Sequence, residues 1–303
     1  MVSNSRVDWI SLLKASLKKT SKNIFLLVLL ALISASAFPP AQALDGAKKK
    51  GLANDAMRLG NLADDEKVNG ETRDAALIHI NQALKLEPKN HWLWYQKADI
   101  LQKMEEDADG LKCIEEAIKL SPKNADYWQV KANLYRYSGK KQEALTSVQQ
   151  ALKLDPANVN ALGVRGKILG DLKRYAEAES VYDQLIKQMP DNNTVRSSRM
   201  VVSKAQRKWS KVVEDADFCL QNKESKVYPR YNVLLARAEA YEALKNYPKA
   251  VADCRAALKC FKDDREPHKR LIRLYTLMGD KKRAAEETVA LREIDEDLSP
   301  PTR

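Results

Sequence analysis

Four cysteines and three histidines are the residues of this 303-residue chain that could bind a metal ion or act as nucleophiles. They are Cys113, Cys219, Cys254, Cys260, His79, His91 and His268. The cysteines form no C-x-x-C pair, and the histidines have no cysteine or carboxylate at the spacing that a metal site requires. The sequence therefore predicts neither a metal ion nor a cofactor.

Catalytic motifs are also missing from the sequence, which contains no G-x-S-x-G, no phosphate-binding loop and no H-E-x-x-H. Acidic pairs such as Glu105-Glu106 are adjacent on a predicted helix, so their side chains point apart. We therefore predict that the protein is not an enzyme. Cys219, Cys254 and Cys260 are expected in the core, with a Cys219–Cys254 disulfide as an alternative in an oxidising compartment. The histidines are expected at the surface or in a groove.

The elements that must position these residues are indicated by a strict repeat. Four prolines recur at intervals of 34 residues, and each closes a similar segment such as ALKLEPKN or AIKLSPKN. They are Pro88, Pro122, Pro156 and Pro190. A fixed period of this length is typical of a chain built from stacked copies of one supersecondary unit. An asparagine follows each proline by two, where its side chain can cap the next helix. These are Asn90, Asn124, Asn158 and Asn192.

The unit at 125–158 carries the residues that indicate its class. Large and small packing residues are followed by a glycine turn, further small residues and the proline. They are Trp128, Ala132, Tyr135, Gly139, Ala144, Val148, Ala151 and Pro156. Over residues 56–298 the chain resembles the tetratricopeptide repeat family, in which each unit is a hairpin of two helices, A and B. The small residue of helix A recurs as Ala98, Gly166 and Ala238.

The resemblance implies an all-α protein, a right-handed α-solenoid of about seven helical hairpins. The predicted units cover about 56–90, 91–124, 125–158, 159–192, 193–226, 231–264 and 265–298. A lead-in at 44–55 precedes them and a tail at 299–303 follows, which leaves the last helix either exposed or covered by a partner.

Unit 193–226 departs from the pattern. Arg196 and Arg199 stand where apolar residues usually sit in helix A, and Cys219 replaces Ala or Leu in helix B. Four extra residues follow at about 227–230. We expect this unit to be the weakest-packed one and a place where the array bends.

The N-terminal segment has the order of a secretory signal peptide. A basic region precedes an uninterrupted apolar run at residues 24–33, and small residues at 41–43 form an A-x-A cleavage site. We predict a signal peptide over 1–43, with cleavage after Ala43, or alternatively after Ala37. The protein would then be exported to a periplasmic or extracellular location. Retention of the apolar run as a membrane anchor is the alternative, although the run is shorter than a spanning helix needs.

The family resemblance also implies a concave wall, lined by helix A residues near positions 2, 5, 9 and 12 of each unit. Transferred to this chain, the candidate partner-binding residues are Trp92, Tyr95, Asp99, Gln129, Asn133, Arg136, Lys167, Lys269 and Arg273. Trp92 and Tyr95 are extra aromatic residues suited to a partner contact. Packing of Trp92 against the region of Leu84 or Leu86 is the alternative. Lys269, Arg270 and Arg273 form a basic cluster that would suit an acidic partner.

The net charge of +11 is not concentrated in one block, because lysines and glutamates interleave along the repeats. This pattern argues against a nucleic-acid partner. The sequence therefore predicts an exported scaffold that binds a protein or peptide segment in its groove. A membrane-anchored envelope assembly factor and a polyanion binder are the alternatives. The sequence predicts no particular oligomeric state.

Overall fold

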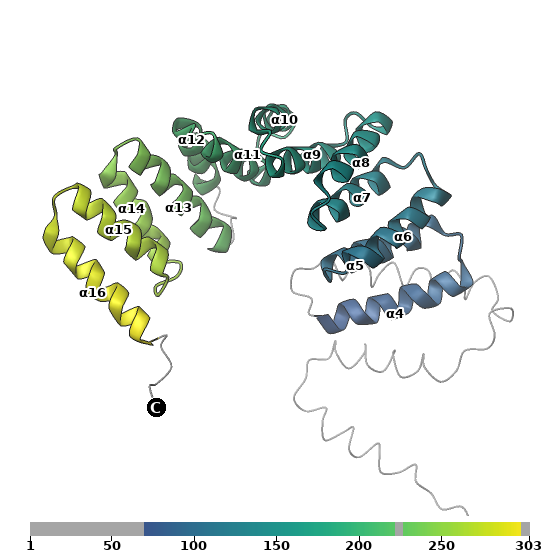
Figure 1. The fold of residues 1–303 in the computed structure, drawn as a ribbon, viewed down its shortest axis with the longest axis horizontal. Coiled ribbons are helices and arrows are strands. Elements are labelled where there is room, and N and C mark those ends of the chain that lie inside the picture. Colours follow the sequence, from purple (N-terminus) through teal and green to yellow (C-terminus); the bar gives the residue numbers. More distant parts are fainter. Residues whose placement is uncertain (1–69, 222–226, 298–303) are drawn as a thin grey trace, which may run out of the picture. The chain divides into compact units, whose positions relative to one another are not determined.

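The computed structural model describes residues 70–221 and 227–297, which form thirteen α-helices and no strand (Figure 1). They are α4 (Gly70–Leu86), α5 (His91–Lys103), α6 (Asp107–Leu120), α7 (Ala125–Tyr137), α8 (Lys141–Leu154), α9 (Val159–Asp171), α10 (Tyr175–Gln188), α11 (Asn193–Ala205), α12 (Trp209–Gln221), α13 (Val227–Ala243), α14 (Tyr247–Leu258), α15 (Arg265–Leu277) and α16 (Lys281–Asp297). The predicted all-α class is confirmed. The predicted signal peptide, the lead-in, residues 56–69 of the first unit and the tail lie outside the described residues.

The chain divides into two compact units, Met1–Lys123 and Asn124–Arg303. In the first unit, α4 packs against α5, and α5 and α6 form a hairpin. The core here gathers around Ala76, Ile80, Leu93 and Ile100, which are at most 1% exposed. Because each helix covers the apolar face of its neighbour, this core follows the helix order along the chain.

The second unit contains five successive hairpins, from α7–α8 to α15–α16. Each hairpin packs against the next, and helices A of consecutive hairpins contact each other in the pairs α7–α9, α9–α11 and α11–α13. One buried cluster runs through the first three hairpins, from Ala132 to Val202. The stacked-hairpin architecture expected from the 34-residue period is therefore present.

Side-chain caps begin the A helices as predicted. The Asn90 Oδ1 accepts hydrogen bonds from the amides of Trp92 and Leu93, and Asn124, Asn158 and Asn192 accept equivalent bonds at the next three A helices. Asp264 does the same for α15, where the asparagine is absent. These bonds satisfy amides that have no partner inside the helix.

Close helix crossings explain the small residues of the repeat. Ala98, Ala132 and Ala238 are fully buried in the middle of their A helices. Gly166 takes this place in α9, because a Cβ there would lie 2.7 Å from the Tyr182 Cζ. The aromatic ring of Tyr182 thus occupies the volume that a methyl group fills in the other hairpins.

The turns between helices A and B share one backbone conformation throughout the described residues. The fifteenth residue of each unit has φ between 58° and 75°, the left-handed region that glycine adopts most easily. Gly139 and Gly279 occupy it in two turns. In the other four turns the residues are Glu105, Lys173, Arg207 and Lys245.

The four cysteines are free thiols, so the Cys219–Cys254 disulfide is not formed. Cys219 and Cys254 are buried, as expected, and Cys113 is buried as well. Burial raises the pKa of Cys254 to about 12. Cys260 is half-buried. The surface or groove position expected for His268 is wrong, because this side chain is buried and its Nδ1 lies 2.7 Å from Glu287 Oε2. No helix within the two described ranges combines the length and apolar composition needed to cross a bilayer.

Replacing each of three glycines by alanine tests this geometry. Gly139→Ala should lower the free energy of unfolding by about 1 kcal/mol, because an L residue is strained at φ 75° although nothing crowds its Cβ. Gly163→Ala should raise it by up to about 1 kcal/mol, because this open helical position favours alanine. Gly166→Ala should lower it through the clash with Tyr182.

Urea unfolding followed by circular dichroism would measure all three glycine variants. Equal effects at Gly139 and Gly163 would contradict the assigned conformations.

Candidate functional site

A cavity of about 840 Å³ lies on the A-helix side of the second unit. Its wall is formed by α11, α13 and α15, together with the first residue of α12 and the turn before it. The lining residues are Met200, Val201, Lys204, Ala205, Arg207, Trp209, Asn232, Leu235, Ala236, Glu239, Glu266 and Arg270. Most of them come from three successive A helices, so the stacking of the hairpins itself creates this site.

Two further hollows adjoin the cavity through shared walls. One of about 310 Å³ lies towards α9 and shares Val201 and Ala205 with it. Another of about 520 Å³ lies towards the ends of α13 and α15 and shares Trp209, Glu239 and Arg270. We call these three adjoining hollows the trough. It follows the A helices from α9 to α15.

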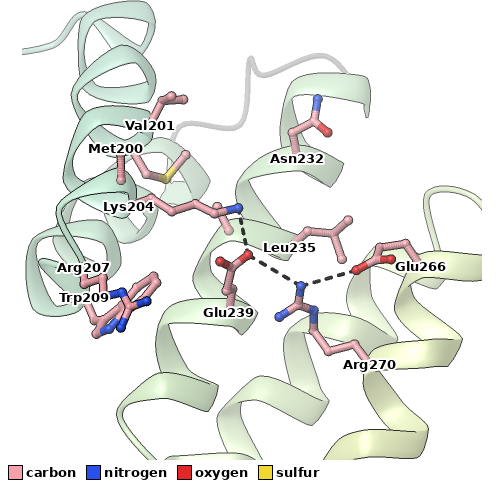
Figure 2. Close-up of a pocket in the computed structure, with 12 residues that line it drawn as sticks. Met200, Val201, Lys204, Arg207, Trp209, Asn232, Leu235, Glu239, Glu266 and Arg270 are labelled. Atoms are coloured by element: carbon pink, nitrogen blue, oxygen red, sulfur yellow. Dashed lines mark hydrogen bonds and ion pairs between the residues drawn. The ribbon is translucent and has the colours of Figure 1, made fainter. Parts of the chain in front are cut away.

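A chain of ion pairs crosses the middle of the trough (Figure 2). The Lys204 Nζ lies 2.7 Å from Glu239 Oε2, and the Arg270 Nη2 lies 3.5 Å from the same atom and 3.3 Å from Glu266 Oε1. Arg270 also contacts Glu242 at 3.1 Å. These contacts link α11, α13 and α15, so the acidic groups of the trough floor are already neutralised by the protein.

Apolar side chains remain open to solvent between these charges. Val201 is 67% exposed although it lies on a helix that is otherwise well packed, and Leu277 at the far end is 52% exposed. Leu235 and Trp209 are half-buried in the wall. A surface that combines exposed apolar groups with neutralised charges is suited to contact with a peptide or protein.

Towards α9 the floor of the trough is made of small residues. Gly166 and Gly170 line this end, together with Lys167 and Asp171. Partial burial, and secondarily the nearby charge of Arg136, lower the pKa of Lys167 below its ordinary value. Because a desolvated ammonium gains most from a hydrogen-bonding partner, this end of the trough favours an acceptor group.

A buried arginine holds α11, which forms the centre of the trough wall. The Arg199 guanidinium makes a bidentate contact with Asp215, with nitrogen–oxygen distances of 2.9 and 2.5 Å, and also contacts Asp183 at 2.7 Å. Asp215 is fully buried. Hydrogen bonding to Asp215 raises the pKa of Arg199, so the guanidinium stays charged. It thereby fastens α11 to α12 of its own hairpin and to α10 of the preceding one.

The same arrangement recurs one hairpin later. Arg237 on α13 makes a bidentate contact with Asp253 on α14, at 2.8 and 2.6 Å, and contacts Asp217 on α12 at 2.6 Å. We call the Arg199 and Arg237 groups the two arginine braces. The expectation that unit 193–226 is the weakest-packed one is not supported, because its unusual arginine is buried and fully paired.

Three of the predicted groove residues lie at or beside the trough. Lys167 and Arg273 line it, and the exposed Lys269 does not. The predicted basic cluster is wrong as a source of free positive charge, because Arg270 and Arg273 are paired with glutamates. Only Lys269 of that cluster has no ion pair within the described part of the chain.

The predicted residues on α7 lie outside the trough lining. Gln129 and Asn133 are half-buried. The Arg136 Nη1 lies 3.2 Å from Asp171 Oδ2 and thereby connects α7 with α9. Arg136 is thus engaged within the protein, whereas a partner-binding role for the two amides stays a prediction.

The remaining three predicted residues belong to α5 in the first unit. Trp92 is half-buried and packs against the cluster that includes Leu84, which is the alternative that the sequence left open. Tyr95 is half-buried as well. Asp99 lies 2.7 Å from Lys103, and burial raises the pKa of Asp99 to about 6.

The residues that sequence reasoning missed are the groove positions of units 193–226 and 231–264. Positions 9 and 12 of the former are Val201 and Lys204, and positions 5 and 9 of the latter are Leu235 and Glu239. All four line the cavity. The positional rule used for the other units would have found them, had it been extended across the irregular unit and the insertion.

Comparison with known proteins agrees with the repeat class. Sequence patterns of the tetratricopeptide repeat family match residues 93–124 and 130–193. No curated protein matches the chain. A solved tetratricopeptide repeat protein from Parabacteroides merdae is 17% identical, with a TM-score of 0.58 over 82% of this chain and 94% of that one. Pseudomonas aeruginosa PilF is 13% identical, with a TM-score of 0.60 over 73% of this chain and 97% of PilF.

The chain is therefore a helical-repeat protein that contains tetratricopeptide repeats. At these identities the two solved structures establish the fold alone. Tetratricopeptide repeats generally bind protein or peptide partners, and the fold accordingly indicates an interaction scaffold. Among the described residues, no group of three or more His, Cys, Asp and Glu side chains could hold a metal ion.

The first arginine brace can be tested through stability. Arg199→Met should lower the free energy of unfolding by about 3 kcal/mol, because it leaves Asp215 buried without its bidentate partner. Adding Asp215→Leu should restore much of the loss. Arg174→Met is the matched control, since it removes an exposed bidentate pair with Glu177 and should change stability little.

Urea unfolding would compare the two brace variants and the control variant with the unsubstituted protein. If Arg199→Met costs no more than Arg174→Met, the brace does not hold α11.

Proposed function

We propose that the protein is an interaction scaffold that binds a segment of another protein in the trough. The observation that carries this proposal is the position of Val201, an apolar side chain that is 67% exposed where two of the adjoining hollows meet. Exposed apolar groups within a concave surface are characteristic of sites that a partner covers. The acidic groups of the trough floor are already paired, so they do not by themselves require a ligand.

The dimensions of the trough favour an elongated ligand over a small molecule. Its three hollows are open and adjoin one another, and none encloses its contents as a small-molecule pocket does. A peptide segment can place alternate apolar side chains against Val201, Leu235 and Leu277. Its backbone can meanwhile bond to polar groups such as Asn232 and Ser198 on the wall.

Peptides selected from a random display library against the full chain provide the test. Val201→Asp should weaken their binding at least about tenfold, because the introduced carboxylate would be desolvated beneath the peptide. Val289→Asp is a matched control, since Val289 is also an exposed valine, 53% exposed, but lies on α16 outside the trough. Fluorescence anisotropy with labelled peptides would measure both affinities.

Equal binding to the two valine variants would show that the trough is not the site. Failure of the chain to select any peptide would contradict the scaffold function itself.

We further propose that the protein is exported. The support is the order of the N-terminal sequence, in which a basic region, the apolar run at 24–33 and small residues at 41–43 follow one another. In a periplasmic or extracellular location, the trough would bind partners from the cell envelope or from outside the cell. Retention of the apolar run would instead make the protein a membrane-anchored envelope factor with the same trough.

N-terminal sequencing of the protein made in a secreting bacterial host would separate these two forms. Cleavage after Ala43 should give a mature chain that starts at Leu44. A chain that keeps residues 24–33 and fractionates with membranes would contradict cleavage and favour the anchored form. A full-length chain in the cytosol would contradict export altogether.

A further inference from the structure

The turns between helices A and B of the second unit carry a row of exposed cations. Six lysine or arginine side chains in these turns have neither an ion pair nor a side-chain hydrogen bond within residues 124–221 and 227–297, whereas Lys141 donates to the Asp171 carbonyl. They are Lys140, Lys173, Arg207, Lys245, Lys281 and Lys282. Their neighbours Arg174, Lys208 and Arg283 are, by contrast, paired with carboxylates. We call these six residues the basic row.

Two members of the basic row line the trough. The five hairpins repeat in the same sense, so their A–B turns lie at the same end of the helices. Arg207 lines the central cavity and Lys245 lines the hollow next to it. In Figure 2, Arg207 takes no part in the ion-pair chain that joins Lys204 to Glu266. A ligand lying in the trough would therefore lie beside an edge whose positive charge is not neutralised by the protein.

At the opposite end of the helices, lysines before the connections that follow α8 and α10 are balanced by acids within a few residues, as Lys153 is by Asp155 and Lys187 is by Asp191. The corresponding A–B turn of the first unit is acidic, with Glu105, Glu106 and Asp107 in succession. The basic row is thus confined to one edge of the second unit rather than being a consequence of the overall net charge.

Three members of the basic row share one backbone conformation. Lys173, Arg207 and Lys245 have φ of 58° or 59°, a region that costs an L residue free energy relative to glycine. Gly139 and Gly279 occupy the equivalent place in the first and last hairpins of the second unit. These three cations therefore occupy the same position of successive turns.

We infer that the segment bound in the trough carries acidic residues that pair with the basic row; this inference rests on the proposed function. A protein segment fits better than a nucleic acid or a lipid surface. A peptide can direct apolar side chains to the exposed Val201 and carboxylates to the edge, whereas a nucleic acid has no aliphatic side chain to place against Val201.

The test compares two triple variants of the full chain that remove the same charge. Lys173→Gln/Arg207→Gln/Lys245→Gln removes the centre of the basic row. Lys153→Gln/Lys187→Gln/Lys259→Gln removes three exposed lysines near the ends of B helices. Peptides selected by the unsubstituted chain from a random display library should be enriched in Asp and Glu. They should bind the first variant about tenfold more weakly and the second within about twofold. Raising the salt concentration should weaken the wild-type complex.

Each other outcome is decisive. If the selected peptides are not acidic, or bind both triple variants alike, the inference is wrong. The proposed function still stands in that case if Val201→Asp abolishes their binding. Tighter binding of duplex DNA, or of phosphatidylglycerol vesicles, than of acidic peptides also overturns the inference. If no peptide is selected at all, the proposed function fails and the inference fails with it.

Discussion

Each of the first four helical hairpins of the second unit has an apolar face that the next hairpin covers. This packing requires small residues such as Ala132 and Gly166 at the crossings, where the helices approach most closely. It also aligns the A helices of successive hairpins, and the trough is the surface that this alignment leaves between them. The site thus follows from the way the core is buried, since no loop or inserted domain is needed to form it.

The two arginine braces let the stack continue where apolar packing is interrupted. Arg199 and Arg237 each join three helices through one buried and one partly exposed carboxylate, and one brace lies before and the other after the four-residue insertion. Arg199 lies two residues before Val201, the most exposed apolar residue of the trough. The rigidity of the binding surface therefore depends on ion pairs beneath it, while the surface itself remains apolar and available.

Most of the fold could be predicted from the sequence, because it is encoded locally. The period, the asparagine caps and the small crossing residues each need only a few neighbouring positions. The arginine braces could not be predicted in this way, since Arg199 pairs with carboxylates 16 residues away on two different helices. The trough was missed for a related reason, because Lys204 and Glu239 resemble solvated charges until the structure brings them together. Trp92 and Asp99 met the positional rule, yet neighbours within the first unit already engage them.

Hydrogen–deuterium exchange of the full chain, with and without a selected peptide, would test most directly whether the trough is the binding site. Binding there should slow exchange in α11, α13 and α15, whose side chains form the wall, and leave α14 and α16 nearly unchanged. Protection confined to the B helices, or to α4–α6 of the first unit, would contradict the assignment of the trough.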